Sequence, residues 1–226
     1  LHYEASLWRP GQRSHAESPD FFLADEGDKD ARAELHATLA AFFSESLQIQ
    51  QQHPQCAFIA RRHWLARKLA FDSARLPLQD CEHYASWREG IGAVSLSLIY
   101  PEGFMNNPAS MFGHTLLRLD IRRETGAEDM LAYAVDFTGD TRGESTMIYV
   151  AKGIVGLYSG YFGVNPYYQQ LERYADWENR DIWEYRLAFG EAELDFVMMH
   201  LWELRGVAFP YYFFDENCSY QLLQLM

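Results

Sequence analysis

The sequence is short of positive charge and of long apolar runs. It has 19 lysines and arginines against 32 aspartates and glutamates, which gives a formal net charge of −13 at pH 7. This balance argues against non-specific nucleic-acid binding and against electrostatic attraction to anionic lipid, because both need a basic surface. No apolar run approaches the roughly 20 residues that a membrane-spanning helix needs. A membrane-embedded substrate therefore has to be reached through apolar contacts.

Cysteine is also scarce, with only Cys56, Cys81 and Cys218. The first two are 25 positions apart on either side of a helical stretch, which predicts a loop-closing disulfide and an oxidising compartment. The alternative is two free, buried cysteines in a cytosolic protein. If the pair is bridged, the remaining thiol is inert, pairs between chains, or is reactive. No CxxC or HExxH motif is present, so we predict neither a metal site nor a cofactor.

What the chain does have is enough apolar material for a large core. It has 226 residues, of which 48% are hydrophobic and 15% aromatic, so we expect a folded protein rather than a disordered one. It begins with LHYEASLW, with no signal peptide, and stops at QLLQLM within a predicted helix. We therefore expect an excised or truncated domain whose missing ends carry the targeting information and whose missing region after residue 226 makes a membrane contact.

The hydrophobic periodicity changes from helical to alternating near Gly90. This predicts an α+β protein with an N-terminal helical subdomain, residues 1–89, and a core, residues 90–226. A helix is predicted from the Asp30 cap to His53, and a second over residues 57–71 with a basic face in solvent. The core is predicted as an antiparallel meander with strands at residues 93–100, 111–121, 130–137 and 179–189, and with mixed loop and strand at 149–174. After the meander we predict a helix at 191–205, an extended run at 209–214 and a helix from 218.

The last cysteine lies in the stretch DENCSYQLL, at the predicted start of the final helix. Asp215 or Asn217 can cap that helix. A thiol in the first turn faces unpaired backbone N–H groups and the positive end of the helix dipole. Both are expected to lower the pKa of Cys218 and to favour the nucleophilic thiolate. The same N–H groups are expected donors for an oxyanion formed on an attacked carbonyl.

A cysteine nucleophile usually needs a base, and His114 is the candidate among the eight histidines. It follows a Gly- and Asn-rich loop and begins a strongly apolar strand, so its ring is held by a sheet yet lies at a loop mouth. The other seven histidines are interpreted as exposed or structural.

These two segments resemble a known superfamily. SMFGHTLLRL followed by DENCSYQLL is similar to circularly permuted NlpC/papain-like enzymes such as lecithin–retinol acyltransferase, in which the histidine strand precedes the cysteine. More narrowly, LHY, FFLA, FGHTLLRL, NRDIWEYRL and NCSY resemble the N-terminal periplasmic domain of Lnb-type proteins. The resemblance implies a permuted papain-like fold, a periplasmic location, Cys218 as nucleophile and His114 as base. It also implies lipoprotein N-acylation through a Cys218 thioester, with phospholipid and lipoprotein as substrates.

The resemblance also implies a third catalytic residue on the strand after the histidine strand. If the hairpin turns near Thr125 and Gly126, Asp136 lies across from His114 and its carboxylate can orient the imidazole. The alternative is that Asp136 only caps the strand end. Further candidates for lining the site are the cap residue Asn217 and, in the loop before His114, Asn107 and Ser110. Five aromatic residues form either an acyl-chain surface or plain core: Tyr158, Tyr161, Phe162, Tyr167 and Tyr168.

Two other functions stay open at this point. Related folds include cysteine peptidases and amidases that act on cell-wall peptides, because a shared fold does not determine the substrate. The domain could also be a non-catalytic interaction module of the envelope, in which case Cys218 is buried and unreactive.

Overall fold

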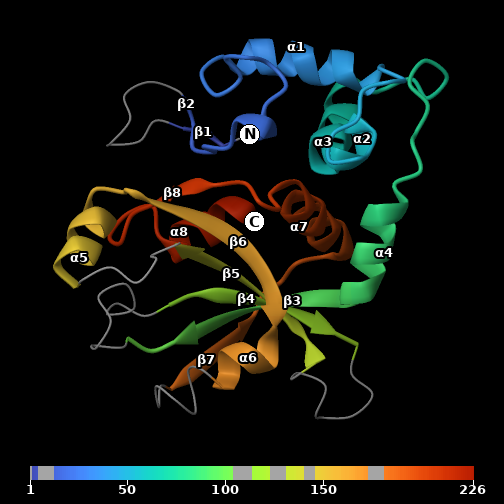
Figure 1. Ribbon diagram of the computed structural model, residues 1–226. Coiled ribbons are helices and arrows are strands. Elements are labelled where there is room, and N and C mark those ends of the chain that lie inside the picture. The colour runs from blue at the N-terminus through green and yellow to red at the C-terminus, as the bar shows by residue number, and fades with distance from the viewer. Residues whose placement is uncertain (1, 5–12, 104–113, 123–130, 140–145, 173–180) are drawn as a thin grey trace. The chain divides into compact units, whose positions relative to one another are not determined.

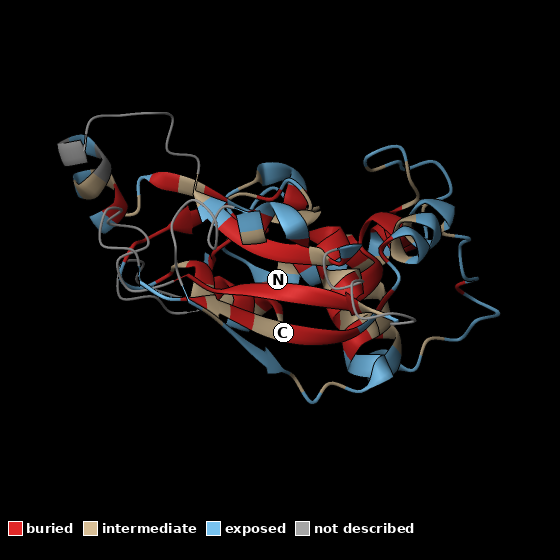
Figure 2. Ribbon diagram, turned by 90° about the horizontal axis from the view of Figure 1, so that it is seen from below, coloured by how far each residue is buried: buried red, intermediate tan, exposed pale blue. Residues whose placement is uncertain are grey.

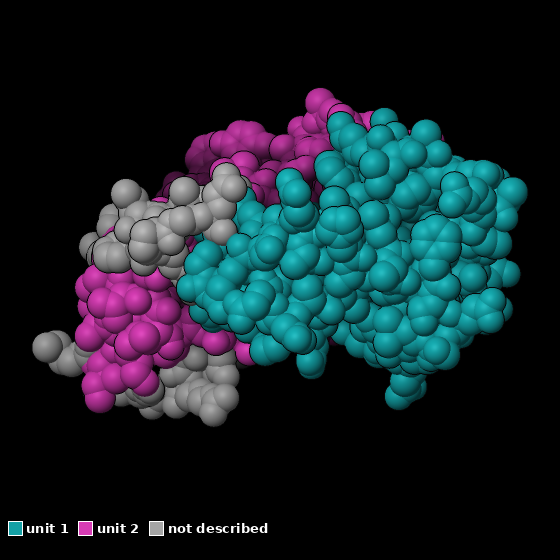
Figure 3. All heavy atoms as spheres, turned by 90° about the horizontal axis from the view of Figure 1, so that it is seen from above, with its two compact units in different colours: residues 1–86, 198–209 teal, residues 87–197, 210–226 magenta. Residues whose placement is uncertain are grey.

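The structure is a computed structural model that describes residues 2–4, 13–103, 114–122, 131–139, 146–172 and 181–226 (Figure 1). The chain divides into two compact units, which Figure 3 shows in two colours. Unit 1 consists of residues 1–86 and 198–209, and unit 2 of residues 87–197 and 210–226. Helices and an antiparallel sheet are both present, which confirms the predicted α+β class.

Unit 1 is mainly helical. Its elements are β1 (Tyr3–Glu4), β2 (Arg13–Ser14), a 3-10 turn η1 (Pro19–Phe21), α1 (Ala31–Phe42), α2 (Pro54–Ala57) and α3 (Ile59–Leu69). As predicted, Asp30 caps α1, and its side chain accepts hydrogen bonds from the backbone N–H groups of Arg32 and Ala33. The helix ends at Phe42, however, and not near His53. The Ser44 hydroxyl accepts from the Leu47 N–H, which offers the backbone an alternative to the helix.

The second predicted helix differs from the structure in two ways. It is split into α2 and α3, and the basic face predicted to lie in solvent includes Arg61, which is buried. The Arg61 guanidinium bonds Glu34 Oε1 at 2.9 Å and the Phe21 carbonyl at 2.6 Å, and lies 3.5 Å from Glu203 Oε2. Only Arg67 and Lys68, in the last turn, are exposed as predicted. Periodicity could not identify the buried cation, because its partners come from distant parts of the sequence.

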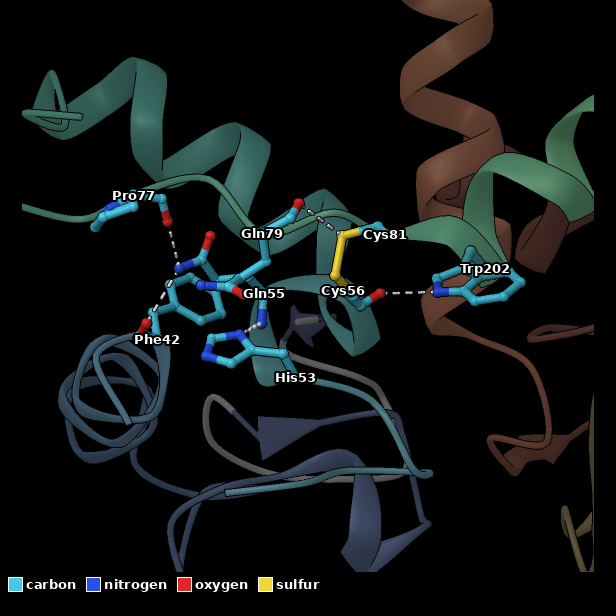
Figure 4. The surroundings of a disulfide bond; sticks show 8 residues. All are labelled: Phe42, His53, Gln55, Cys56, Pro77, Gln79, Cys81 and Trp202. Carbon is cyan, nitrogen blue, oxygen red and sulfur yellow. Dashed lines mark hydrogen bonds between the residues drawn. A yellow bond between two sulfur atoms is a disulfide. The ribbon is translucent and has the colours of Figure 1, made fainter. Parts of the chain in front are cut away.

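The predicted disulfide between Cys56 and Cys81 is confirmed, with the two Cα atoms 5.2 Å apart (Figure 4). It joins α2 to the segment that leads into α4 (Glu82–Ile91). The neighbouring Gln55 side chain donates to the carbonyls of Phe42 and Pro77, and Trp202 Nε1 donates to the Cys56 carbonyl at 2.9 Å. The bridge therefore lies within a hydrogen-bonded part of unit 1.

Unit 2 is built on a six-stranded sheet with the order β7-β3-β4-β5-β6-β8. Its remaining elements are β3 (Ala93–Pro101), β4 (Leu116–Ile121), β5 (Tyr133–Gly139), α5 (Thr146–Ile154), β6 (Tyr158–Pro166), α6 (Tyr167–Leu171), β7 (Ile182–Arg186), α7 (Glu191–Glu203), β8 (Phe209–Tyr211) and α8 (Cys218–Leu225). The helix α7 and the strand β8 each have residues in both units. Residues 149–174, predicted as loop and strand, contain α5 and α6 as well as β6.

The alternation of side chains along the sheet puts different partners on its two faces. Leu116 packs with Ile99 and Tyr167, the first residue of α6, in a fully buried cluster. The preceding Thr115 side chain instead contacts Ser219 of α8. Because successive residues of an extended chain point to opposite faces, α6 and α8 cover opposite faces of the sheet. The central strands β4 and β5 are largely buried and the edge strand β7 is exposed (Figure 2).

The aromatic run at residues 209–214 leads from β8 into α8. Phe213 donates its backbone N–H to the Gly153 carbonyl at 2.9 Å. A Cβ atom on Gly153 would lie 2.3 Å from the Phe213 ring, so only glycine allows this close approach. The run is buried apart from Phe214, but only Phe209–Tyr211 forms the extended strand that was predicted over residues 209–214. It holds the start of α8 against the sheet.

Candidate functional site

The start of α8 is built by Asn217. Its side-chain oxygen accepts hydrogen bonds from the backbone N–H groups of Ser219 at 3.1 Å and Tyr220 at 3.3 Å. Asn217 is thus the N-cap, one of the two caps that the sequence offered, and Cys218 is the first residue of the helix. The cysteine is buried, with 4% of its surface exposed, and is not part of a disulfide.

The structure brings the beginning of β4 to the beginning of α8. The hydroxyls of Thr115 and Ser219 are 2.6 Å apart, within hydrogen-bond distance. The adjacent His114 is buried, with its backbone N–H bonded to the Pro101 carbonyl at 3.3 Å. The two segments that carry the candidate base and nucleophile are therefore neighbours, although about a hundred residues separate them in the sequence.

Burial dominates the ionisation of the thiol. Loss of solvent raises the pKa of Cys218, while hydrogen bonds from the Thr115 amide and from Ser219 oppose the shift. This direction is opposite to the lowering that we expected from the helix start, because removing a thiolate from water is more costly than these bonds compensate. Cys218 is therefore a protonated thiol at neutral pH, and a base has to take its proton before it can attack.

The first-turn amides also differ from the expectation. The N–H groups of Ser219 and Tyr220 donate to Asn217, so they are not open donors for an oxyanion. A residue that sequence reasoning missed is Gln221, which lies one turn after Cys218 and is 1% exposed. Its side-chain NH₂ has no hydrogen-bond partner among the described residues. Helical side chains lean toward the N-terminus, so this amide extends toward the turn that holds Cys218. The i, i+3 spacing is the sequence signal that could have identified it.

Asp136 is buried on β5 and already has polar partners. Gln170 of α6 donates to its Oδ2 at 2.9 Å, and Asn165 of β6 to its Oδ1 at 3.5 Å. Leu117 pairs with Val135, so the same antiparallel register carried back by one residue places Asp136 across from Leu116. It therefore lies two residues along the chain from the position opposite His114. Its carboxylate holds α6 to the sheet, and its role toward His114 stays a prediction.

The other candidate lining residues are less informative. Tyr161 is on β6, paired with Thr138, and is 39% exposed. Asn107 and Ser110, and the turn predicted near Thr125, lie outside the described residues. Within the described ranges, no group of three or more His, Cys, Asp or Glu side chains is placed to hold a metal ion. The helices of those ranges are all too short or too polar to cross a membrane.

The cap itself gives a testable expectation. Asn217→Ala removes the acceptor for two partly buried backbone N–H groups and should destabilise the protein by about 1 kcal/mol. Asn217→Ser keeps a capping oxygen and should lose much less. Urea unfolding followed by circular dichroism compares the two variants. Equal losses would show that the amide matters here for packing and not for capping.

Residues 83–226 match the family described as the Lnb N-terminal periplasmic domain, and residues 1–68 match a family described as a domain of unknown function, DUF7843. No curated protein and no solved structure matches the chain. The first match covers more than half of the chain and includes His114, Asp136 and Cys218.

Proposed function

Because the chain belongs to the family of Lnb N-terminal periplasmic domains, and is thus an envelope-associated periplasmic domain, we propose that it is a thiol-dependent acyltransferase. The observation that carries the proposal is the contact between the hydroxyls of Thr115 and Ser219 at 2.6 Å, which brings the segment that carries His114 next to the segment that carries Cys218. A buried thiol at a capped helix start, next to a peptide that carries a histidine, is an arrangement suited to covalent catalysis. The disulfide is consistent with the oxidising periplasm.

In the proposed reaction His114 accepts the Cys218 proton as the sulfur attacks the ester carbonyl of a phospholipid. The tetrahedral oxyanion forms beside Gln221, whose unpartnered NH₂ is the donor that we assign to it. Collapse breaks the ester bond, and the lysophospholipid alkoxide leaves with the proton from His114. The α-amine of a lipoprotein then attacks the Cys218 thioester, which forms an amide and returns the proton to the thiolate. Dividing the transfer in two replaces one difficult step by two easier ones.

Alkylation by iodoacetamide across pH tests the Cys–His pair first. The native thiol should react with a midpoint above its ordinary pKa, because burial raises the pKa of Cys218. Under denaturing conditions the midpoint should fall, since the unfolded thiol is solvated. His114→Ala should slow alkylation at neutral pH because it removes the base, whereas His83→Ala, which replaces an exposed histidine of unit 1, should not. A rate that does not change in His114→Ala would remove His114 from the mechanism.

Substrate class requires a second measurement. Incubating the protein with phospholipid and measuring its intact mass should detect an acyl adduct that is absent from Cys218→Ala. Addition of a lipopeptide with a free N-terminal amine should discharge the adduct and produce an N-acylated peptide. If cell-wall peptides are cleaved instead, with no acyl adduct, the domain is a peptidase or amidase. A Cys218 that reacts with neither probe would favour a non-catalytic interaction module.

A further inference from the structure

A cavity of about 500 Å³ lies in unit 2 against the edge of the sheet formed by β7, β3 and β4. Its polar lining comes from side chains that pair across the three neighbouring strands. Arg186 of β7 pairs with Ser97 of β3, which pairs with Arg118 of β4, and Ser95 pairs with Asp120. Paired residues in a sheet point to the same side, so these side chains share one face. That face also carries Leu116 and α6, and is opposite to the face that α8 and Cys218 cover.

The floor of the cavity is a fixed polar network. Arg118 Nε donates to Asp120 Oδ1 at 2.7 Å, and the hydroxyls of Ser95 and Ser97 donate to Asp120 Oδ2 at 3.0 and 2.7 Å. Arg118 also donates to Glu184 Oε2 at 3.0 Å. Arg118, Asp120, Ser95 and Ser97 are all buried. Both carboxylates of the cavity, Asp120 and Glu184, are therefore hydrogen-bonded within the protein, and Arg118 is the cation that they share.

Two further guanidiniums line the same cavity and are not neutralised. Arg122 and Arg186 are exposed, and neither guanidinium forms an ion pair or hydrogen bond with a residue in the described ranges. With Arg118 they contribute three positive charges against the two negative charges of Asp120 and Glu184. In a chain that carries 32 acidic and 19 basic residues, a cavity with excess positive charge is unusual. Such a concave surface attracts an anion.

We propose that this cavity is a second ligand site, which binds a phosphate group between Arg122 and Arg186. Guanidinium groups bind oxyanions through paired, charge-assisted hydrogen bonds. A carboxylate is satisfied by one such fork, whereas a phosphate has enough acceptor oxygens to engage two guanidiniums on different strands. Val94 and Ile121 provide apolar wall for the carbon stem of a phosphate ester. The site is separate from Cys218, so it does not depend on the proposed acyltransferase activity.

Isothermal titration with inorganic phosphate, at constant ionic strength, tests the site. We expect saturable binding to one site and a loss of about 10-fold or more in affinity in the double variant Arg122→Gln/Arg186→Gln. The control Arg67→Gln/Arg75→Gln removes two exposed arginines outside the cavity, so it has the same net charge as Arg122→Gln/Arg186→Gln. It should bind phosphate like the wild type. Absence of saturable binding, or equal affinity in the two double variants, would overturn the proposal.

Further probes identify the kind of anion and its source. Acetate should compete poorly, and if it binds as tightly as phosphate the preference for phosphate is wrong. Glycerol 3-phosphate and phosphatidylglycerol vesicles then separate two sources of the same group. Binding of the soluble ester alone assigns a soluble phosphate ester, whereas vesicle flotation that Arg122→Gln/Arg186→Gln abolishes assigns a lipid headgroup. Either result supports the site, while flotation that persists in this variant shows that vesicles bind elsewhere.

Discussion

Arg61→Met should destabilise the protein by about 3–5 kcal/mol, since it leaves two buried carboxylates without their cation. Arg61 bonds Glu34 and the Phe21 carbonyl, and its backbone N–H donates to Glu203 Oε1 at 2.7 Å. Its guanidinium also lies over the rings of Phe21 and Phe58, at 4.3 and 4.0 Å from their centroids. One side chain thus connects α1, α3, the last residue of α7 and the N-terminal segment within unit 1.

Urea unfolding measures this loss, with Arg67→Met as the matched control on the same helix. Arg67 is exposed, and its replacement should change the free energy of unfolding by less than about 0.5 kcal/mol. A triple variant that adds Glu34→Gln and Glu203→Gln to Arg61→Met should recover part of the loss, because it removes the unpaired charges. Equal stability of Arg61→Met and Arg67→Met would show that the buried ion cluster contributes nothing.

The loss in Arg61→Met should also depend on pH. Burial raises the pKa of Glu203 and Arg61 opposes the shift, so removing Arg61 raises the pKa further. A carboxyl whose pKa is higher in the folded than in the unfolded state favours folding in acid, and this contribution is lost as the pH rises through the folded pKa. The difference between Arg61→Met and wild type should therefore be smaller in mildly acidic buffer than at neutral pH. Unfolding curves at the two pH values measure it.

Reduction of the Cys56–Cys81 disulfide should lower the free energy of unfolding by about 3 kcal/mol. The bridge closes a segment with a sequence separation of 25, and opening it increases the conformational entropy of the unfolded chain. Unfolding in urea with and without reductant measures the effect. The Cys56→Ala/Cys81→Ala variant should be as unstable as the reduced protein and insensitive to reductant. If reductant changes the wild type and this variant equally, its effect does not come from the disulfide.

A loss much smaller than this would also be informative. It would mean that residues 56–81 retain their arrangement without the bridge, held by the bonds from Gln55 to Phe42 and Pro77 and from Trp202 to Cys56. In that case Gln55→Leu should lower the free energy of unfolding of the reduced protein, because it removes the bonds to Phe42 and Pro77. Cys218 remains in all these variants and serves as an internal thiol for quantification.

Several features of the fold followed from local sequence. Asp30 and Asn217 both act as helix caps. Their side chains accept hydrogen bonds from backbone N–H groups two and three residues further along the chain, so the effect is local. The strand β3 was predicted almost to its ends, because alternation over successive residues reports burial on one face. The disulfide was predicted from the only two cysteines that flank a helical stretch. The order of His114 and Cys218 in the sequence supported the resemblance to the family whose model matches residues 83–226.

Other features depend on residues that are distant in the sequence. Local pattern assigned Arg61 to solvent, and only the packing of Glu34 and Glu203 around it places the charge in the interior. The same is true of the Cys218 pKa, whose direction is decided by burial and not by the position of the residue in its helix. Arg186, Ser97 and Arg118 pair across three strands, and the sequence does not predict that these strands are neighbours in the order β7-β3-β4.

By itself, then, the sequence predicted the Asp30 cap, two candidate caps for the last helix, most strands, the disulfide and, through the family resemblance, the two residues of the proposed chemistry. These properties depend on periodicity, capping groups and motif order, which act over a few residues or are preserved along the chain. Only the tertiary structure decided that Thr115 meets Ser219, that the side-chain NH₂ of Gln221 is buried with no hydrogen-bond partner among the described residues, and that Arg122 and Arg186 line one cavity. Those properties depend on register and on desolvation, and both are set by which distant segments pack together.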